Sequence, residues 1–363
     1  MNIAIIDAEI VGKKKHRFPN LACMKLSGWH KRAGNNVILK TDYDNLSEYD
    51  KVFISRVFTK TVVPYDVLGL RNVHFGGTGF YHDKSPPLPP EIEHSKPDYH
   101  LYNDWVADRV SLGAKEKEFA YYKDYSIGFT TRGCHKKCAF CVNRDSDKSV
   151  AHSPVLEFLD ASRKKICLLD DNFLACPSWK NILLELQSTG KPFQFKQGLD
   201  GRLFTNEKCG LLFRSKYDGE YIFAFDNVEE RELIENQIIR LRRYTNKIPK
   251  FYVLCGFDRN NRWDDEFWLN DIEGVFLRVE ILGRYRCLPY IMRYDRYEES
   301  PFRKIYVDLA RWINQPAFFK KVSFMEFCLK HKENSGTVRF VKEFLKMHPK
   351  FIKPFNERGF VNN

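Results

Sequence analysis

The 363-residue sequence contains no run of 18 consecutive apolar residues, so we expect no transmembrane helix. It has no basic segment ahead of an apolar one at its start, and residues 1–7 predict a strand and not a secretory signal. Outside one short motif, the cysteines show no paired spacing, which argues against a disulfide framework and favours buried thiols in a reducing compartment. We therefore expect a cytoplasmic protein.

One nine-residue segment, Gly-Cys-His-Lys-Lys-Cys-Ala-Phe-Cys, holds three thiols close together, at Cys134, Cys138 and Cys141. Three cysteines on one loop can bind three corners of an iron–sulfur cube and leave the fourth iron without a protein ligand. An open metal position allows a substrate or cofactor to bind there. The alternative is a zinc site completed by His135 or a distant residue. A disulfide is less favoured, because three thiols leave one over.

The chain organisation is predicted from apolar runs and turn residues. Residues 3–6, 37–39, 51–55 and 73–75 predict strands, with a helix over 21–32, in a small α/β domain spanning residues 1–84. The prolines from Pro86 to Pro90 favour an extended spacer, and we assign residues 85–120 to a linker.

A regular alternation of strands and helices begins at Ser126. Strands are predicted over 126–130, 166–170, 193–197, 221–225, 251–255 and 288–293, with helices over 178–188, 229–244 and 264–282. Six parallel strand–helix units favour a partial (β/α)6 barrel within residues 121–300, with a basic, mostly helical extension over 301–363. Active sites on such barrels form at the carboxyl ends of the strands, and the three cysteines follow the first of them.

The cysteine spacing, with Phe140 before the third cysteine and Thr130-Thr131-Arg132-Gly133 before the first, resembles the signature of the radical S-adenosylmethionine (SAM) superfamily. The resemblance covers residues 75–320. It implies a 4Fe–4S cluster on Cys134, Cys138 and Cys141 whose open iron chelates SAM. An electron from a flavodoxin-type or ferredoxin-type donor would then cleave SAM to a 5′-deoxyadenosyl radical, which abstracts hydrogen from a substrate.

Polar groups after the later strands match the SAM cradle that this resemblance implies. The turn of Asp170, Asp171 and Asn172 resembles the one that holds the SAM amino group, and the segment from Gln197 to Arg202 offers a guanidinium for the SAM carboxylate. Contacts to the ribose and adenine are predicted for the residues after the fourth and fifth strands: Asp226, Asn227, Leu254 and Gly256. Asp171 and Asp226 could equally be helix caps.

The N-terminal domain resembles the Rossmann-like domain that precedes the barrel in cobalamin-dependent radical SAM enzymes. Residues 7–12 have the spacing of the D-x-H-x-x-G motif for the lower ligand of cobalt, but Glu9 replaces the histidine. A carboxylate is a poor substitute for imidazole at cobalt. We therefore favour a degenerate domain that shapes the substrate cleft over one that binds cobalamin.

The net charge of +12 is concentrated near the C-terminus, where residues 301–363 hold 13 Lys+Arg and 5 Asp+Glu, or 13 − 5 = +8. Aromatic residues such as Phe340 and Phe351 stand among these cations, a pattern that favours phosphates and stacked bases. A solvated amphipathic helix is the alternative.

The sequence thus predicts a radical SAM enzyme that acts on RNA or another phosphorylated partner. A cobalamin-dependent radical SAM methyltransferase or rearrangement enzyme is the first alternative. The other class left open is a non-catalytic iron–sulfur or zinc protein that binds nucleic acid.

Overall fold

A computed structural model describes residues 1–143, 146–330 and 335–360. Nine residues lie outside this description, and seven of them, 331–334 and 361–363, belong to the predicted C-terminal extension. The chain divides into two compact units, which are described separately. The first contains residues 1–197 and 215–218, and the second contains 198–214 and the chain from 219 onward. Within the described part, no helix combines the length and apolar character that a membrane crossing requires.

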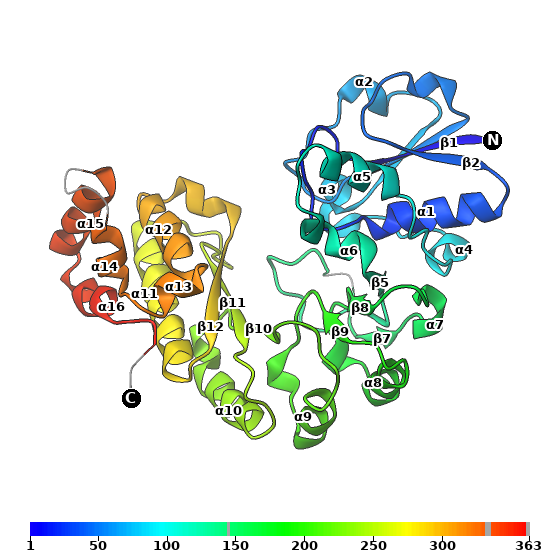
Figure 1. Cartoon of the computed structure of the whole chain (residues 1–363). Helices are drawn as coiled ribbons and strands as arrows, with labels where there is room; N and C mark the ends of the chain where they lie inside the picture. Colours follow the sequence, from blue (N-terminus) through cyan, green and yellow to red (C-terminus); the bar gives the residue numbers. More distant parts are fainter. Residues whose placement is uncertain (144–145, 331–334, 361–363) are drawn as a thin grey trace. The chain divides into compact units, whose positions relative to one another are not determined.

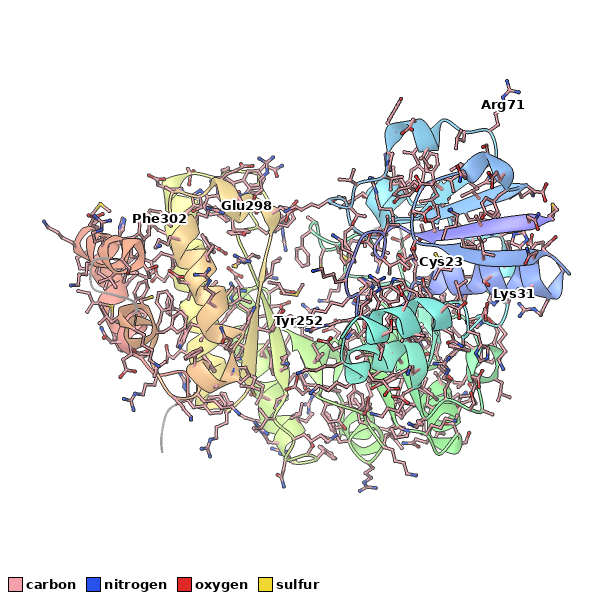
Figure 2. All side chains as sticks on the ribbon, turned by 45° about the horizontal axis from the view of Figure 1, so that its top comes forward. Cys23, Lys31, Arg71, Tyr252, Glu298 and Phe302 are labelled. Atoms are coloured by element: carbon pink, nitrogen blue, oxygen red, sulfur yellow. The ribbon has the colours of Figure 1, made fainter. Side chains whose placement is uncertain are left out.

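The first unit begins with a four-stranded parallel sheet in the order β2-β1-β3-β4 (Figure 1). Its elements are β1 (Asn2–Asp7), α1 (Leu21–Arg32), β2 (Asn36–Lys40), β3 (Lys51–Ser55), α2 (Tyr65–Leu68), β4 (Val73–Gly76) and α3 (Thr78–Tyr81). All four predicted strands and the predicted helix are present. Along β1, Ile3 and Ile5 face one apolar cluster while Ala4 and Ile6 face another, so both faces of this strand are buried. Cys23 of α1 lies in the first cluster, with its sulfur 3.9 Å from the Ile6 carbonyl (Figure 2).

The segment predicted as an extended linker is folded. It contains α4 (Pro90–Glu93) and α5 (Asn103–Ser111), and α6 (Ala120–Lys123) follows. Ile92, Tyr102 and Trp105 from this segment are buried in the same cluster as Ile3 and Ile5. The prolines end at the start of α4, where a missing backbone donor costs a helix nothing. The apolar side chains after Pro90 explain the difference, because they bury surface that a spacer would expose.

The first unit ends with a three-stranded parallel sheet in the order β5-β8-β9 and a two-stranded antiparallel ladder, β6-β7. The elements are β5 (Tyr125–Gly128), β6 (Thr131–Arg132), β7 (Val150–Ala151), α7 (Val155–Phe158), β8 (Lys165–Leu168), α8 (Trp179–Ser188) and β9 (Phe193–Phe195). Side chains alternate between the two faces of the sheet. On one face, a Cβ atom at Gly128 would lie 2.3 Å from the Phe158 ring, so α7 packs there in direct contact with the strand backbone.

The second unit contains a three-stranded parallel sheet in the order β10-β11-β12. Its elements are α9 (Asn206–Leu212), β10 (Ile222–Ala224), α10 (Arg231–Arg242), β11 (Lys250–Cys255), α11 (Asp265–Arg284), β12 (Leu288–Arg293), α12 (Arg303–Ile313), α13 (Pro316–Phe319), α14 (Phe324–Leu329), α15 (Gly336–Met347) and α16 (Ile352–Asn356). The six strands predicted after Ser126 are therefore all present, as two parallel sheets of three. Their closure into one partial barrel stays a prediction.

The C-terminal helices α12, α14, α15 and α16 (Figure 1) pack against one another through aromatic side chains. Phe344 of α15 packs against Phe302, with ring centroids 5.3 Å apart, and against Phe351, with ring centroids 5.1 Å apart. Phe351 and Phe355 are fully buried. The helical character of this extension is confirmed. Phe351, however, cannot stack on a base as its sequence context suggested, because its ring already fills the interior.

Candidate cofactor site at the cysteine loop

The three motif cysteines lie on a loop whose two ends are joined by the β6-β7 ladder. Thr131 pairs with Ala151 and Arg132 pairs with Val150, and the His152 amide donates to the Thr130 carbonyl at 2.9 Å. We use "cysteine loop" for residues 133–143 and 146–149. Because the ladder closes its base, the loop leaves and re-enters the protein beside the carboxyl end of β5.

Gly133 opens the loop in a conformation that other residues rarely adopt, with φ of +88°. A Cβ atom there would lie 2.3 Å from the Ser146 hydroxyl oxygen and 2.4 Å from the Lys148 carbonyl oxygen. The glycine thus lets the two limbs of the loop approach closely before the first cysteine.

The turn after β8 holds the cysteine loop through three consecutive side chains. Asp170 accepts from the Thr130 amide at 2.7 Å and from the Thr130 hydroxyl at 2.5 Å. Asp171 accepts from the Gly133 amide at 2.8 Å and from the Asn143 side chain at 2.6 Å. Asn172 donates to the Cys134 sulfur at 3.4 Å. The turn predicted to hold the SAM amino group therefore binds the residue ahead of the β6-β7 ladder, the start of the loop at Gly133, the first thiol, and Asn143 after the third cysteine.

Asp170 is buried, and burial raises its pKa to about 6 although both Thr130 donors favour the carboxylate. Each of its oxygens accepts a hydrogen bond from Thr130, and its contact with the SAM amino group stays a prediction. Asp171 accepts from two residues of the cysteine loop, Gly133 and Asn143. A helix cap would instead accept from the first amides of α8, and neither observed partner is one of these. The helix-cap alternative for this residue thus finds no support among its observed bonds.

The environment of the three motif cysteines differs from that of the other seven. All ten are free thiols, but Cys134, Cys138 and Cys141 are half-buried while the others are buried. The Cys141 amide donates to the Cys138 carbonyl at 2.9 Å, and the Asn143 amide donates to the Cys141 sulfur at 3.4 Å. Phe140, also half-buried, stands within this turn.

Amide hydrogens directed at Cys134 and Cys141 are the kind of second-sphere contact that iron–sulfur thiolates receive. Three accessible thiols on one short loop fit three corners of a cluster. Among the described residues, no three His, Cys, Asp or Glu side chains converge on one point as a metal group.

Glu93 of α4 joins the base of the cysteine loop to the N-terminal domain. Its carboxylate lies 3.0 Å from the Lys25 ammonium, 3.6 Å from Arg132 and 3.5 Å from His152. Arg132 precedes Gly133 and His152 follows β7, so one half-buried carboxylate contacts both sides of the loop base. Burial lowers the pKa of His152, and we expect its ring to be neutral at pH 7.

Gln197 is exposed and lies two residues after the end of β9, whereas the other predicted cradle residue from that segment, Arg202, belongs to the second unit. The Arg202 guanidinium donates to Asp200 at 2.6 and 3.1 Å and to Glu230 at 2.8 and 3.0 Å. Although burial opposes its charge, these carboxylates raise the pKa of Arg202 above its usual range. Its pairing with the SAM carboxylate stays a prediction, since the partners observed for the guanidinium are Asp200 and Glu230.

The structure brings three of the remaining predicted residues together in the second unit. Asp226 accepts from the Leu254 amide at 3.3 Å, and Gly256, with φ of +75°, donates to Asp271 at 2.8 Å. Arg278 donates to the carbonyls of Asp226 at 2.6 Å and Leu254 at 3.0 Å. Asn227 is exposed at the adjoining turn. Burial raises the pKa of Asp226, and Arg278 opposes this shift.

Sequence reasoning missed the buried polar residues behind these strand ends. Arg278 is 3% exposed and Asp271 also accepts from the Tyr306 hydroxyl at 2.8 Å. Asp271 and Arg278 are seven residues apart on α11, and therefore lie on its same face, among apolar side chains. One sequence signal could have identified Asp271 and Arg278: an acidic and a basic residue that both fall on the otherwise apolar face of a long helix.

Glu9 has a structural role in the N-terminal domain. Its carboxylate accepts from the amides of Val57 and Phe58, both at 3.0 Å, and from the Thr61 hydroxyl at 2.7 Å. The side chain is thus committed to the loop after β3. It does not fit the role of an imidazole that binds cobalt from below.

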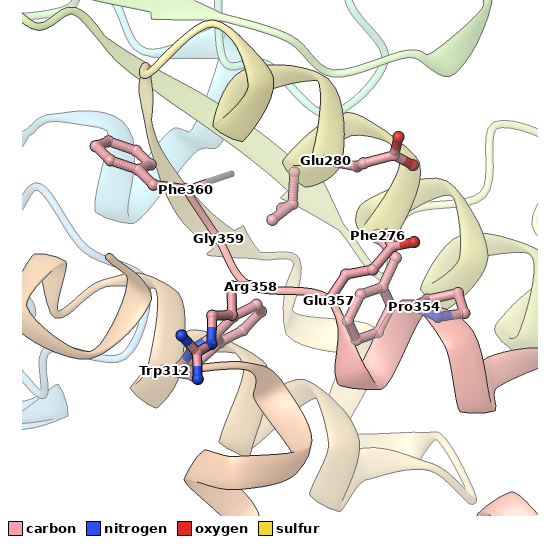
Figure 3. Close-up of a pocket in the computed structure, with 9 residues that line it drawn as sticks. Phe276, Glu280, Trp312, Pro354, Glu357, Arg358, Gly359 and Phe360 are labelled. Atoms are coloured by element: carbon pink, nitrogen blue, oxygen red, sulfur yellow. The ribbon is translucent and has the colours of Figure 1, made fainter. Parts of the chain in front are cut away.

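A cavity of about 420 Å³ lies in the second unit between α11, α12 and the chain after α16 (Figure 3). Phe276 and Trp312 contribute to its wall, and no predicted site residue does. Two charged groups at the cavity already have partners, since Glu280 pairs with Arg284 at 2.9 Å and Arg358 with Glu326 at 3.2 Å.

Comparison with known proteins identifies the fold. No protein-family model matches the sequence, and no curated protein matches it. Among solved structures, the chain has the fold of a radical SAM enzyme. Similar structures include two of the radical S-adenosylmethionine methyltransferase TsrM from Kitasatospora setae. One was solved with cobalamin and a [4Fe-4S] cluster, the other with tryptophan and the SAM analogue aza-SAM.

Each TsrM structure aligns with a TM-score of 0.52 at 12% identity, over 80% of this chain and 72% of TsrM. The cobalamin-dependent SAM radical enzyme OxsB aligns over 99% of this chain and 64% of its own, at 12% identity and a TM-score of 0.46, a similarity too low to establish a common fold. The resemblance found in the sequence is thus confirmed at the level of the fold.

Proposed function

We propose that this protein is a radical SAM enzyme whose 4Fe–4S cluster is held by Cys134, Cys138 and Cys141. The observation that carries the proposal is the set of hydrogen bonds by which the Asp170-Asp171-Asn172 turn holds the cysteine loop and the residue before its ladder. This turn fixes the loop at the carboxyl end of a parallel sheet, where active sites of such folds lie. The radical SAM fold, found independently of the motif, supports the same assignment.

The bound cluster would supply the electron that cleaves SAM to methionine and a 5′-deoxyadenosyl radical, which abstracts hydrogen from the substrate. The chain's own residues hold the thiols, orient SAM and exclude water. Asn172 and the Asn143 amide direct hydrogens at two thiol sulfurs, where they stabilise the thiolate form that binds metal. A flavodoxin-type or ferredoxin-type donor would reduce the cluster.

For the substrate, we propose RNA or another phosphorylated partner. Three cations on the exposed face of α15, Arg339, Lys342 and Lys346, support this class. They lie at positions i, i+3 and i+7, opposite the buried Val341 and Phe344. Phe351 is buried and Phe340 is half-buried, so we expect contacts mainly to phosphates and binding that is largely independent of base sequence.

A cobalamin-dependent methylation or rearrangement is the second candidate. The fold shared with TsrM, which was solved with cobalamin bound, favours it. The parallel β2-β1-β3-β4 sheet provides a domain of suitable type. Because Glu9 is bonded to the loop after β3, a corrinoid would bind without a protein ligand from that position. Retention of hydroxocobalamin after desalting would favour this candidate, and loss of its absorption band would favour the first.

The proposal is tested by anaerobic reconstitution with iron and sulfide, reduction with SAM present, and chromatography for 5′-deoxyadenosine. The wild type should form this product, and alanine at Cys134, Cys138 or Cys141 should abolish it. Cys328→Ala is the matched control, since this buried thiol lies among the C-terminal helices. Product formation that survives each motif change would refute the proposal.

A further inference from the structure

A polar network lines the face of the β5-β8-β9 sheet that is turned away from α7. On this face, Tyr125, Cys167 and Leu21 pack with Phe18 and Tyr121 from the preceding segments. Alternation along the strands places Lys165, Gln194 and Lys196 on the same face. Polar side chains on a covered sheet face require hydrogen-bond partners.

These side chains are connected from one end of the strands to the other. The Lys196 ammonium donates to the Tyr121 hydroxyl at 3.1 Å, and that hydroxyl donates to the Gln194 carbonyl oxygen at 3.3 Å. The Gln194 amide donates to Asp218 at 3.3 Å, and Lys165 donates to Asp218 at 2.8 Å. The charges of Lys165 and Asp218 balance each other. Lys196, at the opposite end, is left with a neutral phenol.

Lys196 is thus a half-buried cation held in place without a counter-charge. Its ammonium lies 4.5 Å from the centroid of the Tyr121 ring and 5.7 Å from that of Phe18. Within residues 1–143, 146–330 and 335–360, no carboxylate oxygen comes within 4.0 Å of it. Aromatic faces attract a cation but do not neutralise its charge. Of the three hydrogens of the Lys196 ammonium, one is donated to an observed acceptor, the Tyr121 hydroxyl.

The location of Lys196 relates it to the cysteine loop. It follows the last residue of β9, and its amide donates to the Leu168 carbonyl at the end of β8 at 2.8 Å. β8 continues into the turn that holds the loop, and β5 leads into the loop itself. Two inter-strand spacings separate β9 from β5, or about 10 Å. A ligand at the thiols that extends along this strand edge would come within reach of the ammonium.

We propose that Lys196 binds an anionic group, a carboxylate or a phosphate, of the molecule that occupies the site at the cysteine loop. Phe18 and Tyr121 fix the side chain so that little rotamer entropy is lost on binding. Arg202, the cation that the sequence suggested for this task, is already paired with Asp200 and Glu230. The proposal rests on the proposed function for the location of the ligand. It leaves two sources for the anion, the SAM carboxylate and a phosphate of the substrate.

The test compares the wild type with Lys196→Met, which keeps the apolar stem, and with Lys196→Arg, which keeps the charge. Lys164→Met is the matched control, because this exposed lysine pairs with Asp124 ahead of β8. Equilibrium dialysis of the anaerobically reconstituted protein measures binding of SAM, of decarboxylated SAM and of inorganic pyrophosphate. Loss of a charge-assisted hydrogen bond should weaken binding by about 10- to 100-fold.

If the SAM carboxylate is the anion, Lys196→Met weakens SAM binding and leaves decarboxylated SAM unaffected. If a phosphate is the anion, the variant weakens pyrophosphate binding and leaves SAM unaffected. Lys196→Arg should retain most of the affinity in either case, and Lys164→Met should match the wild type. Unchanged affinity of Lys196→Met for both SAM and pyrophosphate would overturn the proposal. A protein that forms no cluster refutes the proposed function, and the pyrophosphate measurement still tests Lys196.

Discussion

Replacing Glu9 by alanine would test whether this residue is a structural anchor. The change removes the acceptor of three donors: the amides of Val57 and Phe58 and the Thr61 hydroxyl. A buried donor left without a partner costs about 1–3 kcal/mol. Phe58 is 60% exposed, so water can reach this loop and the cost per donor should fall near the lower limit. We therefore expect the unfolding free energy to fall by about 3 kcal/mol.

Hydrogen exchange measures the effect at the loop itself. In Glu9→Ala, the amides of Val57 and Phe58 should lose protection by about 10-fold or more, since each loses a bond to a charged acceptor. Glu9→Gln keeps one oxygen for the amides and should lose less. Glu48→Ala, an exposed change in the same domain, is the control. Unchanged protection of both amides in Glu9→Ala would show that Glu9 does not hold the loop.

Four further changes follow from the site and the tail. Gly133→Ala should prevent iron incorporation, because its Cβ would meet Ser146 at 2.3 Å; an iron content equal to the wild type would contradict this. Burial raises the pKa of Asp170 from 3.8 to about 6, so the folded protein favours the protonated carboxyl. Its contribution to the unfolding free energy is therefore complete below pH 4 and is lost as the pH rises through 6, a change of about 3 kcal/mol. Asp170→Asn should flatten that slope in urea unfolding, and an unchanged slope would assign it to other groups. Arg202→Ala should lower the unfolding free energy by about 3 kcal/mol, because Asp200 and Glu230 lose their counter-charge. A SAM affinity that falls as well would support the cradle assignment, and an unchanged affinity would limit Arg202 to a structural role. Charge reversal at Lys342 and Lys346 should reduce the salt dependence of RNA binding by about 1.4 in log–log slope on single strands; RNA affinity that is absent in the wild type would exclude the tail as a polyanion contact.

The strands and the cysteine loop were predictable because their signals are local. Apolar runs such as residues 251–255 fix a strand whatever packs against it, and β11 (Lys250–Cys255) confirms that prediction. The motif spacing likewise indicated three thiols on one loop. The α/β class with parallel strands followed from six such runs in order, whereas closure into a partial barrel stays a prediction.

The roles of individual polar residues were less predictable because they depend on contacts between distant segments. Asp171 contacts Gly133 and Asn143, which lie 38 and 28 residues earlier in the chain. The linker prediction failed for a similar reason: the prolines have a clear local preference, but burial of Ile92 against α1 overrides it. In the basic tail, one local pattern is compatible with two structures. Aromatic residues among cations are typical of a nucleic-acid surface, but they also fit a helix that buries its rings and exposes its charges, as α15 does.

The most direct test of the central assignment is electron paramagnetic resonance of the reduced, anaerobically purified protein with and without SAM. We predict about four iron and four sulfide per chain, and a cluster spectrum that changes when SAM is added. Alanine at Cys134 should remove both the iron and the signal, whereas Cys328→Ala should retain them. One zinc per chain in place of iron, or a cluster spectrum that SAM leaves unchanged, would contradict the assignment.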